Sequence, residues 1–254
     1  MDAVILAGSP NTGKLQECSP VSNEALIDIA GRYMVEYVVD VLKKLPAINR
    51  IVIVGPVEEL TSLYGGDPGI RLVGSGATPV KSLQQGVDQT DWREGDSRVL
   101  VVTSDVPLIS SESIQDFISC CGDQSADFYY PIVSQEANER RFPGVKRTYV
   151  KLKDGIFTGG NIFLVNAEVV ERVAAKAEEF VRLRKSPVAM CRLVGIGFII
   201  KYVSGRLTIS DAERRVSRLL GIRGVCIISK YAEIGVDVDK PGDLELVRKV
   251  LVNP

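Results

Sequence analysis

The residues that indicate chemistry most directly lie near the start of the chain, where a short apolar run opens into a small polar loop. Residues 3–6 read Ala-Val-Ile-Leu, and the loop that follows runs from Gly8 through Ser9 and Gly13 to Lys14. A buried strand that ends in a glycine-bearing loop presents backbone N–H groups to a phosphate, and the lysine adds a positive charge. The loop therefore predicts a phosphate-binding site, and the rest of the chain must indicate which kind of phosphate-binding site it is.

One interpretation of this loop is a P-loop, because Gly8, Gly13 and Lys14 match the spacing G-x-x-x-x-G-K after a strand. A P-loop continues with a serine or threonine that holds Mg²⁺, but Leu15 stands at that position. It also opens a long helix, whereas Pro20 interrupts this chain soon afterwards. These departures disfavour a P-loop NTPase, which stays as a minor alternative.

Carboxylates form the second group of candidate residues. Asp105 follows the apolar run Arg98–Thr103, and Asp237 and Asp239 occupy alternate positions of a short predicted strand. Ligands of open α/β sheets sit at the carboxyl ends of parallel strands, and Mg²⁺ prefers carboxylate oxygens. The three aspartates are therefore candidates for a Mg²⁺ site beside the phosphate loop. The alternatives are helix capping or a turn at Asp105, and capping of the last helix by the later pair.

The composition excludes several other kinds of chemistry. The chain has no histidine, which excludes Ser-His-Asp and Cys-His catalysis and His-ligated zinc. The net charge of −1 gives no indication of binding to nucleic acid or to an anionic membrane, and 45% of the residues are hydrophobic, enough for a large core. The five cysteines include no C-x-x-C motif, and no signal-peptide pattern or membrane-spanning apolar run is present. We therefore expect a cytoplasmic protein without a transmembrane segment.

The elements that must position these residues alternate between strand-like and helix-like runs in the first half of the chain. The predicted strands are Val4–Leu6, Arg50–Val54, Ile70–Val73 and Arg98–Thr103, and the predicted helices are Tyr33–Leu45, Pro79–Val87 and Ser111–Cys121. Arg98–Thr103 is almost wholly apolar, as expected of a strand that is buried on both faces. This order predicts an α/β fold of three layers, in which a mostly parallel sheet lies between two layers of helices.

The second half of the chain is predicted to add strands, helices and a charged loop. The predicted strands are Asp127–Val133, Lys146–Lys153, Ile162–Val165 and Val225–Ser229; the helices are Ala167–Arg184, Val188–Ser204 and one that begins at Pro241; the loop is Ser134–Arg141. We interpret residues 1–254 as one domain with an inserted helical region at about 135–220. For the apolar stretch Val188–Tyr202, a buried helix of this region is favoured over a pocket for a lipid-like molecule or a membrane contact.

Four ordered motifs together give the chain a resemblance to a known family. They are Leu6-Ala7-Gly8, Ala25–Val38, the run VVTSDVPL at Val101–Leu108, and DVDKPGDLEL at Asp237–Leu246. In this combination the sequence resembles the MobA-like nucleotidyltransferases, which are similar to sugar-1-phosphate and methylerythritol-phosphate nucleotidyltransferases. The resemblance covers residues 1–110 well and residues 225–251 fairly well, whereas the middle matches no single member.

The resemblance implies a glycosyltransferase-A-like α/β/α fold and a definite reaction. The enzyme would move an NMP from an NTP to a small phosphorylated acceptor and release pyrophosphate. Lys14 and Asp105 would be catalytic, and Asp105 with Asp237 or Asp239 would hold the cofactor Mg²⁺. The implied nucleotide-binding residues are Leu6, Ala7, Gly8, Ser9, Gly13, Gly76 and Ser82.

The inserted region is where the acceptor would bind. Arg147 is a candidate because a guanidinium pairs well with a phosphate. Gly160 allows a ligand to approach the backbone, and Asn161 offers both a donor and an acceptor. The alternatives are a solvated hairpin face around Arg147, and a bulge or tight turn at Gly160.

Glu24 departs from the pattern of the family, which places a lysine there to meet the α-phosphate. An anion beside a triphosphate would cost roughly several kcal/mol of transition-state stabilisation. Either another cation substitutes, for which Lys14, Arg32 and Lys81 are candidates, or transfer is inefficient. The alternative function is therefore a catalytically weakened nucleotide-binding or regulatory protein on the same fold.

Overall fold

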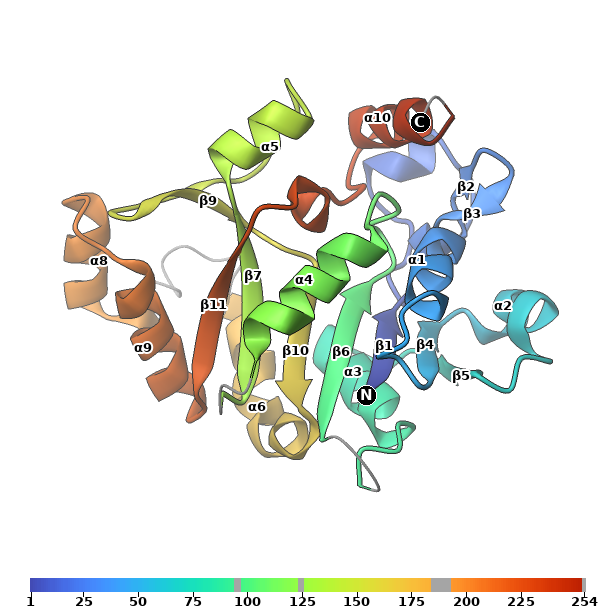
Figure 1. Ribbon diagram of the computed structural model, residues 1–254, viewed down its shortest axis with the longest axis horizontal. Coiled ribbons are helices and arrows are strands. Elements are labelled where there is room, and N and C mark those ends of the chain that lie inside the picture. Colours follow the sequence, from blue (N-terminus) through green and yellow to red (C-terminus); the bar gives the residue numbers. More distant parts are fainter. Residues whose placement is uncertain (94–96, 123–125, 184–192, 253–254) are drawn as a thin grey trace.

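A mixed β-sheet forms the middle of the molecule in the computed structural model, which describes residues 1–93, 97–122, 126–183 and 193–252 (Figure 1). Its nine described strands are β1 (Asp2–Leu6), β4 (Ile51–Gly55), β5 (Ile70–Gly74), β6 (Arg98–Thr103), β7 (Phe128–Ser134), β8 (Val150–Leu152), β9 (Gly155–Gly159), β10 (Ile162–Asn166) and β11 (Gly224–Ser229). A separate hairpin consists of β2 (Asp28–Ile29) and β3 (Arg32–Tyr33).

The sheet is parallel in its first half and mixed in its second. Strands β5, β4, β1 and β6 are hydrogen-bonded in this order and run parallel. Strand β10 is antiparallel to β6 and to β7, which in turn pairs with β9 in antiparallel and with β11 in parallel orientation. The predicted mostly parallel sheet is thus confirmed. Because β1 and β6 are neighbours, the loops that follow them leave the same edge.

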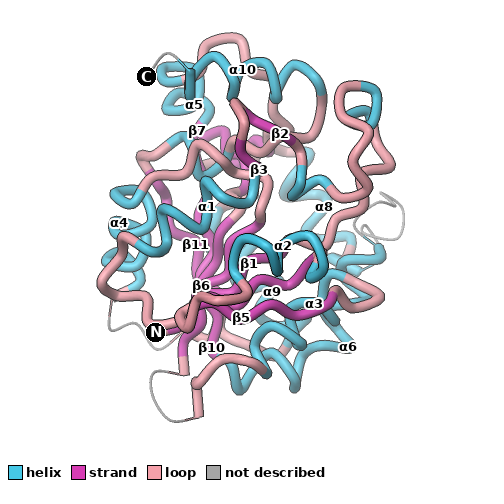
Figure 2. The backbone as a smooth tube through the Cα atoms, turned by 90° about the vertical axis from the view of Figure 1, so that its right-hand side faces the viewer, coloured by secondary structure: helices cyan, strands magenta, loops and turns pink. Residues whose placement is uncertain are grey.

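Helices cover both faces of the sheet. The described α-helices are α1 (Met34–Lys43), α2 (Val57–Tyr64), α3 (Pro79–Asp88), α4 (Ser111–Cys121), α5 (Gln135–Arg141), α6 (Ala167–Leu183), α8 (Ile196–Val203), α9 (Ile209–Leu220) and α10 (Pro241–Val252). Helices α1 and α4 pack on one face and α3 and α6 on the other, so that the strands lie between them when the molecule is turned (Figure 2). The three-layer prediction is confirmed.

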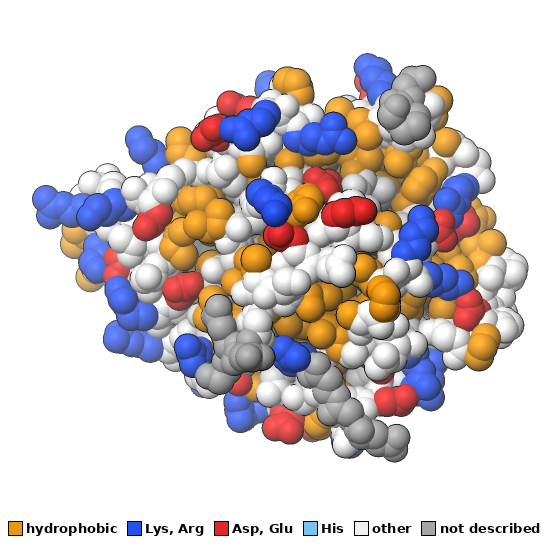
Figure 3. All heavy atoms as spheres, in the orientation of Figure 1, with side chains coloured by type: hydrophobic (Ala, Val, Ile, Leu, Met, Phe, Trp, Pro, Cys, Tyr) orange, Lys and Arg blue, Asp and Glu red, His pale blue; other side chains and the backbone are white. Residues whose placement is uncertain are grey.

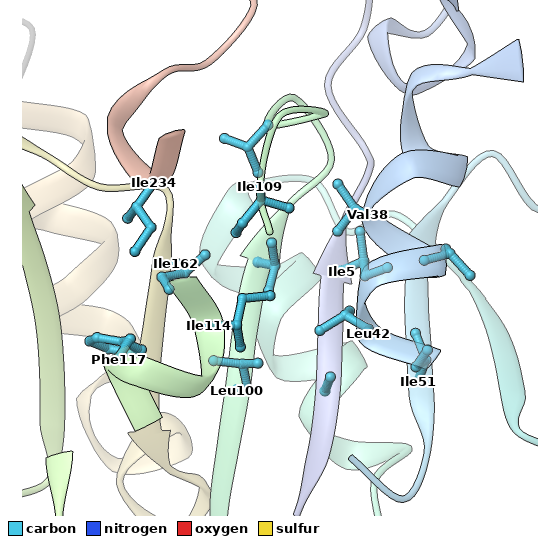
Figure 4. Close-up of a cluster of buried hydrophobic side chains, with 14 of the residues drawn as sticks. Ile5, Val38, Leu42, Ile51, Leu100, Ile109, Ile114, Phe117, Ile162 and Ile234 are labelled. Atoms are coloured by element: carbon cyan, nitrogen blue, oxygen red, sulfur yellow. The ribbon is translucent and has the colours of Figure 1, made fainter. Parts of the chain in front are cut away.

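Alternating side chains of β1 divide the core between these two faces. Ala3 and Ile5 point to the α1 and α4 face, where Ile5 packs with Val38, Leu42, Leu100 and Ile114 (Figure 4). Val4 belongs to the second cluster, with residues from α3 and α6. Since the odd and even positions of a strand face opposite sides, a strand of continuous apolar residues is buried on both faces. This burial fixes the strand whose end carries the glycine-bearing loop.

Several local predictions were wrong or incomplete. The stretch Ser134–Arg141 contains helix α5 instead of a loop, because the Ser134 hydroxyl accepts a hydrogen bond from the Ala137 N–H at 3.1 Å and caps the helix. Helix α2 was not predicted. The strand predicted at Lys146–Lys153 is confined to β8. Residues 135–220 contribute β8, β9 and β10 to the sheet in addition to their helices.

Helix α8 lies on the surface. The stretch Val188–Tyr202 is predicted to be a buried helix, but none of the residues in α8 is buried, and 188–192 lie outside the described residues. The prediction of burial is therefore wrong for the part that the structure describes. Among the described helices, none combines the length and the hydrophobicity that crossing a bilayer requires.

Candidate active site

The glycine-bearing loop and Asp105 meet at the carboxyl edge of the parallel strands. Strands β1 and β6 pair in parallel from Asp2 and Val99 to Leu6 and Thr103. Beyond this pairing, the Ser104 N–H donates to the Leu6 carbonyl at 3.1 Å. Since ligands of open α/β sheets sit at this edge, the fold places both groups where a ligand is expected.

A second segment holds the glycine-bearing loop in place. The Asn11 N–H donates to the Ser22 carbonyl at 2.9 Å, and the Glu24 N–H donates to the Ser9 carbonyl at 3.0 Å. The Asn11 side-chain amide donates to the carbonyls of Ser19 and Val21. The loop therefore lies directly against residues 19–24, and Glu24 is beside it.

The chain after this loop is not that of a P-loop. It forms a single 3₁₀ turn, η1 (Lys14–Glu17), and the first described α-helix begins only at Met34. Leu15, which stands where a P-loop has a magnesium-binding hydroxyl, is buried with Met34 and Val238 in a hydrophobic cluster. The P-loop interpretation is therefore wrong.

Two of the predicted nucleotide-binding residues, Gly76 and Ser82, lie beside Gly8 at the start of this loop. The Gly76 N–H donates to the Ser82 Oγ at 3.0 Å. A Cβ atom added to Gly8 would lie 2.4 Å from the Ser75 Oγ and 3.8 Å from the Ser82 Oγ. The segment before α3 is therefore packed tightly against the start of the loop.

The other predicted nucleotide-binding residues lie at the end of β1 and in the loop that follows it. Leu6 is half-buried, whereas the Ala7 side chain is fully buried, so only the backbone of Ala7 can contact a ligand. Ser9 and Gly13 are exposed in the loop. Lys14 is exposed at the start of η1 and forms no ion pair with a described residue.

The three predicted metal-binding aspartates converge. One carboxylate oxygen from each of Asp105, Asp237 and Asp239 lies within 4.8 Å of the others. The two segments are joined by a hydrogen bond from the Val238 N–H to the Asp105 carbonyl at 2.9 Å, and the Thr103 hydroxyl donates to the Asp105 carboxylate at 2.5 Å. Residues 236–239 form no strand, which differs from the prediction, yet the carboxylates still face one another.

This arrangement is electrostatically unfavourable when all three carboxylates are ionised. Burial raises the pKa of Asp105, and the charge of Asp239 raises it further. Burial and the charges of Asp105 and Asp239 raise the pKa of Asp237 to about 7, against the opposing effect of Arg147. A cation between the carboxylates would relieve this repulsion, because an opposite charge favours the ionised form.

Glu24, which the resemblance places at the α-phosphate, lies close enough to these aspartates to extend the acidic group. Its pKa is raised by burial and by the charges of Asp105 and Asp239. Glu24 begins the 3₁₀ turn η2 (Glu24–Leu26), where the Asn23 side chain accepts a hydrogen bond from the Ala25 N–H at 2.8 Å. This capped turn forms within a few residues, whereas the approach of Glu24 to the aspartates depends on the fold.

Arg147 has a structural partner, and its role in acceptor binding stays a prediction. Its guanidinium donates to the Asp237 carboxylate at 2.6 Å and to the Asp237 carbonyl at 2.8 Å. The side chain is only 6% exposed, and the buried Asp243 carboxylate lies 3.8 Å away. Arg147 thus fixes the segment that carries Asp237 and Asp239. Asp243 is a residue of this arrangement that the sequence reasoning did not single out, although it belongs to the quoted DVDKPGDLEL motif.

Replacing Arg147 with alanine is expected to destabilise the protein, because two carboxylates would lose their buried counter-charge. A loss of about 3 kcal/mol corresponds to a fall in melting temperature of roughly 6–12 °C for a chain of this size. The matched control is Arg140→Ala, which removes an exposed i,i+4 pair with Glu136 and should change the melting temperature little. Thermal denaturation checks both variants, and equal melting temperatures would contradict the role given to Arg147.

Gly160 and Asn161 connect the site to the strands beside it. The Asn161 carbonyl accepts from the Thr103 N–H at 3.0 Å, and its backbone and side-chain N–H groups donate to the Ile234 carbonyl. A Cβ atom on Gly160 would lie 2.6 Å from an Ile234 side-chain carbon, so the glycine permits close packing here. Thr103 also donates to the Asp105 carboxylate, so both residues lie near Asp105. Their role in acceptor binding stays a prediction.

Comparisons with known proteins concern the sequence family and the fold. The sequence model of a family described as the MobA-like NTP transferase domain matches residues 3–188. A solved structure described as a hypothetical transferase from Thermus thermophilus is 33% identical, with a TM-score of 0.81 over 96% of this chain and 98% of that chain. No curated protein matches the chain.

Two further solved structures share the fold at lower identity. A 4-diphosphocytidyl-2C-methyl-D-erythritol synthase from Anaerococcus prevotii is 14% identical, with a TM-score of 0.62 over 99% of this chain and 96% of that chain. A 2-C-methyl-D-erythritol 4-phosphate cytidylyltransferase from Francisella tularensis is 13% identical, with a TM-score of 0.60 over 97% of this chain and 98% of that chain. These likenesses concern the fold alone.

Proposed function

Because the chain belongs to the MobA-like NTP transferase family, we propose that it moves an NMP from an NTP to a small phosphorylated acceptor and releases pyrophosphate. The observation that carries the proposal is the meeting of the Gly8–Lys14 loop with Asp105, Asp237 and Asp239 at one edge of the sheet. Phosphates and a divalent cation could be held side by side there. The acceptor phosphate would attack the α-phosphorus, and the bond to the pyrophosphate would break.

The donor set of the acidic group fits Mg²⁺. All three side chains offer carboxylate oxygens, which this ion prefers, and their mutual repulsion favours a cation. Asp237 already has Arg147 as a partner, whereas Asp239 is exposed and forms no ion pair with a described residue. We therefore expect Asp105 and Asp239 to be the main ligands, with Asp237 in support. When bound, the ion would supply positive charge at the α-phosphate.

The protein's own residues would bind and orient the triphosphate. Backbone N–H groups of the Gly8–Lys14 loop would hold phosphate oxygens, with Lys14 as an additional charge. The backbone around Gly76 and Ser82 would contact the base and ribose, as the resemblance implies. Catalysis of this kind consists mainly of positioning and charge neutralisation. The use of NTPs suits a cytoplasmic location, as does the lack of a disulfide among the described cysteines.

A weakened nucleotide-binding protein is the second candidate function, and Glu24 favours it. An uncompensated carboxylate near Asp105 and Asp239 would repel a triphosphate as well. The candidates for compensation differ in their freedom, because Arg32 pairs with Asp40 at 2.7 Å while Lys14 forms no such pair with a described residue. Lys14 and the exposed Lys81, which also forms no ion pair with a described residue, are therefore better candidates than Arg32 for the missing charge.

Pyrophosphate release from a panel of NTPs and phosphorylated acceptors, with Mg²⁺, separates the two functions. Release that requires both substrates supports the transferase. Thermal stabilisation by an NTP with no release for any acceptor would support the nucleotide-binding protein. If no NTP gave pyrophosphate release or thermal stabilisation, both functions would be contradicted.

Replacing Gly76 with alanine is expected to weaken NTP binding about tenfold or more, since the site has no room for another carbon. The added Cβ would lie 2.6 Å from the Lys81 Cβ and 2.8 Å from the Ser82 nitrogen, and it would displace the backbone that faces the loop. Gly74→Ala is the matched control, because its Cβ would meet no atom within 4 Å. Isothermal titration with the preferred NTP measures the difference. Equal affinities would place the nucleotide elsewhere.

A further inference from the structure

Helix α8 presents an apolar stripe to solvent. Ile196, Ile200 and Val203 are 75%, 60% and 79% exposed. Their spacing of four and three residues places them on one face of the helix, and most residues of the helix are apolar. Scattered exposed aliphatic residues are ordinary, but a continuous stripe of them on one helix indicates an interaction surface. The proposed transferase reaction gives this stripe no role.

The surroundings of α8 are strongly basic. We call residues 150–159 and 193–223 the arm, which comprises β8, β9, α8 and α9 (Figure 1). The turn between β8 and β9 is joined to the helices, because the Lys153 N–H donates to the Leu207 carbonyl and the Ile209 N–H donates to the Asp154 carboxylate. The arm contains eight Lys and Arg residues and three Asp and Glu residues, a formal charge of +5 in a chain of net charge −1.

Several of these basic residues are available to a partner. Within the described residues, the exposed side chains of Lys151, Lys153, Arg206 and Arg218 form no ion pair. Figure 3 shows Lys and Arg side chains gathered at the end of the molecule that carries α8 and α9, with fewer acidic ones among them. The acidic residue Asp211 is already paired with Lys201 and Arg214.

The combination of an aliphatic stripe with an excess of positive charge selects among the possible partners. A second copy of this chain would bring two arms of charge +5 together in a symmetric interface, which is unfavourable. A nucleic acid would satisfy the charge but has no use for exposed isoleucine and valine. An anionic bilayer satisfies both, because it takes up aliphatic side chains at the boundary of its acyl chains and attracts Lys and Arg at its head groups.

We propose that the arm docks the protein on an anionic phospholipid surface, with the stripe Ile196, Ile200 and Val203 inserted at the interface. This docking does not depend on the proposed transferase activity. Because β9 leads directly into Gly160 and Asn161 beside Thr103, the docked arm would also hold the candidate active site close to the bilayer. The protein would then be bound peripherally and reversibly.

Co-sedimentation of the full chain with vesicles tests the proposal. We expect binding to vesicles of phosphatidylcholine with phosphatidylglycerol, little binding to phosphatidylcholine alone, and weaker binding as salt is raised. Ile200→Asp should lower the bound fraction about tenfold or more. Val252→Asp is the matched control, since Val252 is 59% exposed on α10, outside the arm, and this variant should bind as the parent does.

Charge variants form the second part of the experiment. Reversal of Lys153 and Arg206 to glutamate should weaken binding to anionic vesicles, whereas the same reversal at Lys44 and Lys249, outside the arm, should not. Unchanged melting temperatures would show that each variant is folded. Equal binding to both kinds of vesicle, or binding that Ile200→Asp leaves intact, would overturn the proposal. The proposal would also be overturned if light scattering showed a dimer that Ile200→Asp dissociates and the parent protein bound no vesicles.

Discussion

Replacing Asp105 with asparagine is expected to lower kcat/KM for nucleotidyl transfer about 10³-fold. Asparagine keeps the size of the side chain but removes the negative charge that would hold Mg²⁺ beside the loop. The same change should raise the melting temperature measured without divalent cations, because burial and Asp239 make the charged form of Asp105 unfavourable. Activity and stability should therefore change in opposite directions, which a merely structural role would not produce.

The measurement combines pyrophosphate release with thermal denaturation in the presence and absence of Mg²⁺. Asp116→Asn is the matched control, since Asp116 lies on α4 and pairs with Lys230 at 2.9 Å on the surface. That variant should retain parental activity. If Asp105→Asn kept its rate, or if it lost both activity and stability, the proposed metal-binding role of Asp105 would be contradicted.

Replacing Glu24 with lysine is expected to raise the rate of transfer about 10²-fold. The substitution removes a carboxylate that Asp105 and Asp239 already repel and provides a cation for the α-phosphate. The melting temperature without divalent cations should rise as well, because one of the mutually repelling carboxylates disappears.

A charge series distinguishes this explanation from a general gain of positive charge. Glu24→Gln should give an intermediate rate, since it removes the anion without adding a cation. Glu17→Lys adds the same charge to exposed η1 nearby and should leave the rate unchanged. A fall in rate for Glu24→Lys would instead mean that Glu24 assists transfer, and the view that it weakens the enzyme would have to be abandoned.

The parts of the site that were predictable are those that local patterns determine. Val99 to Val102 form a fully apolar run, so the burial of β6 and the position of Asp105 at its end follow from the sequence. The alternation of strands and helices through residue 121 likewise indicates the parallel half of the sheet. Both predictions depend on periodicity over a few residues, which the fold preserves.

The parts that were not predictable depend on contacts between distant segments. Arg147 was interpreted as a candidate for acceptor binding, but its partner Asp237 lies 90 residues further along the chain. Glu24 lies near the aspartates because its backbone N–H donates to the Ser9 carbonyl, which holds it against the glycine-bearing loop. The charged sequence of α5 was interpreted as a loop. The apolar sequence of α8 was interpreted as a buried helix, because hydrophobicity alone does not show which elements remain on the surface.

The cluster that buries Leu15 has a consequence for the order in which the protein matures. Leu15 packs against Val238, and the Arg248 side chain donates to the Asp28 carbonyl, a contact that spans 220 residues. A nascent chain on the ribosome can form β1, β4 and β5 early, but its glycine-bearing loop stays without Asp237 and Asp239 until residues 236–248 have emerged. Contacts of such long range form slowly, so catalytic competence should lag behind the appearance of secondary structure during synthesis and refolding.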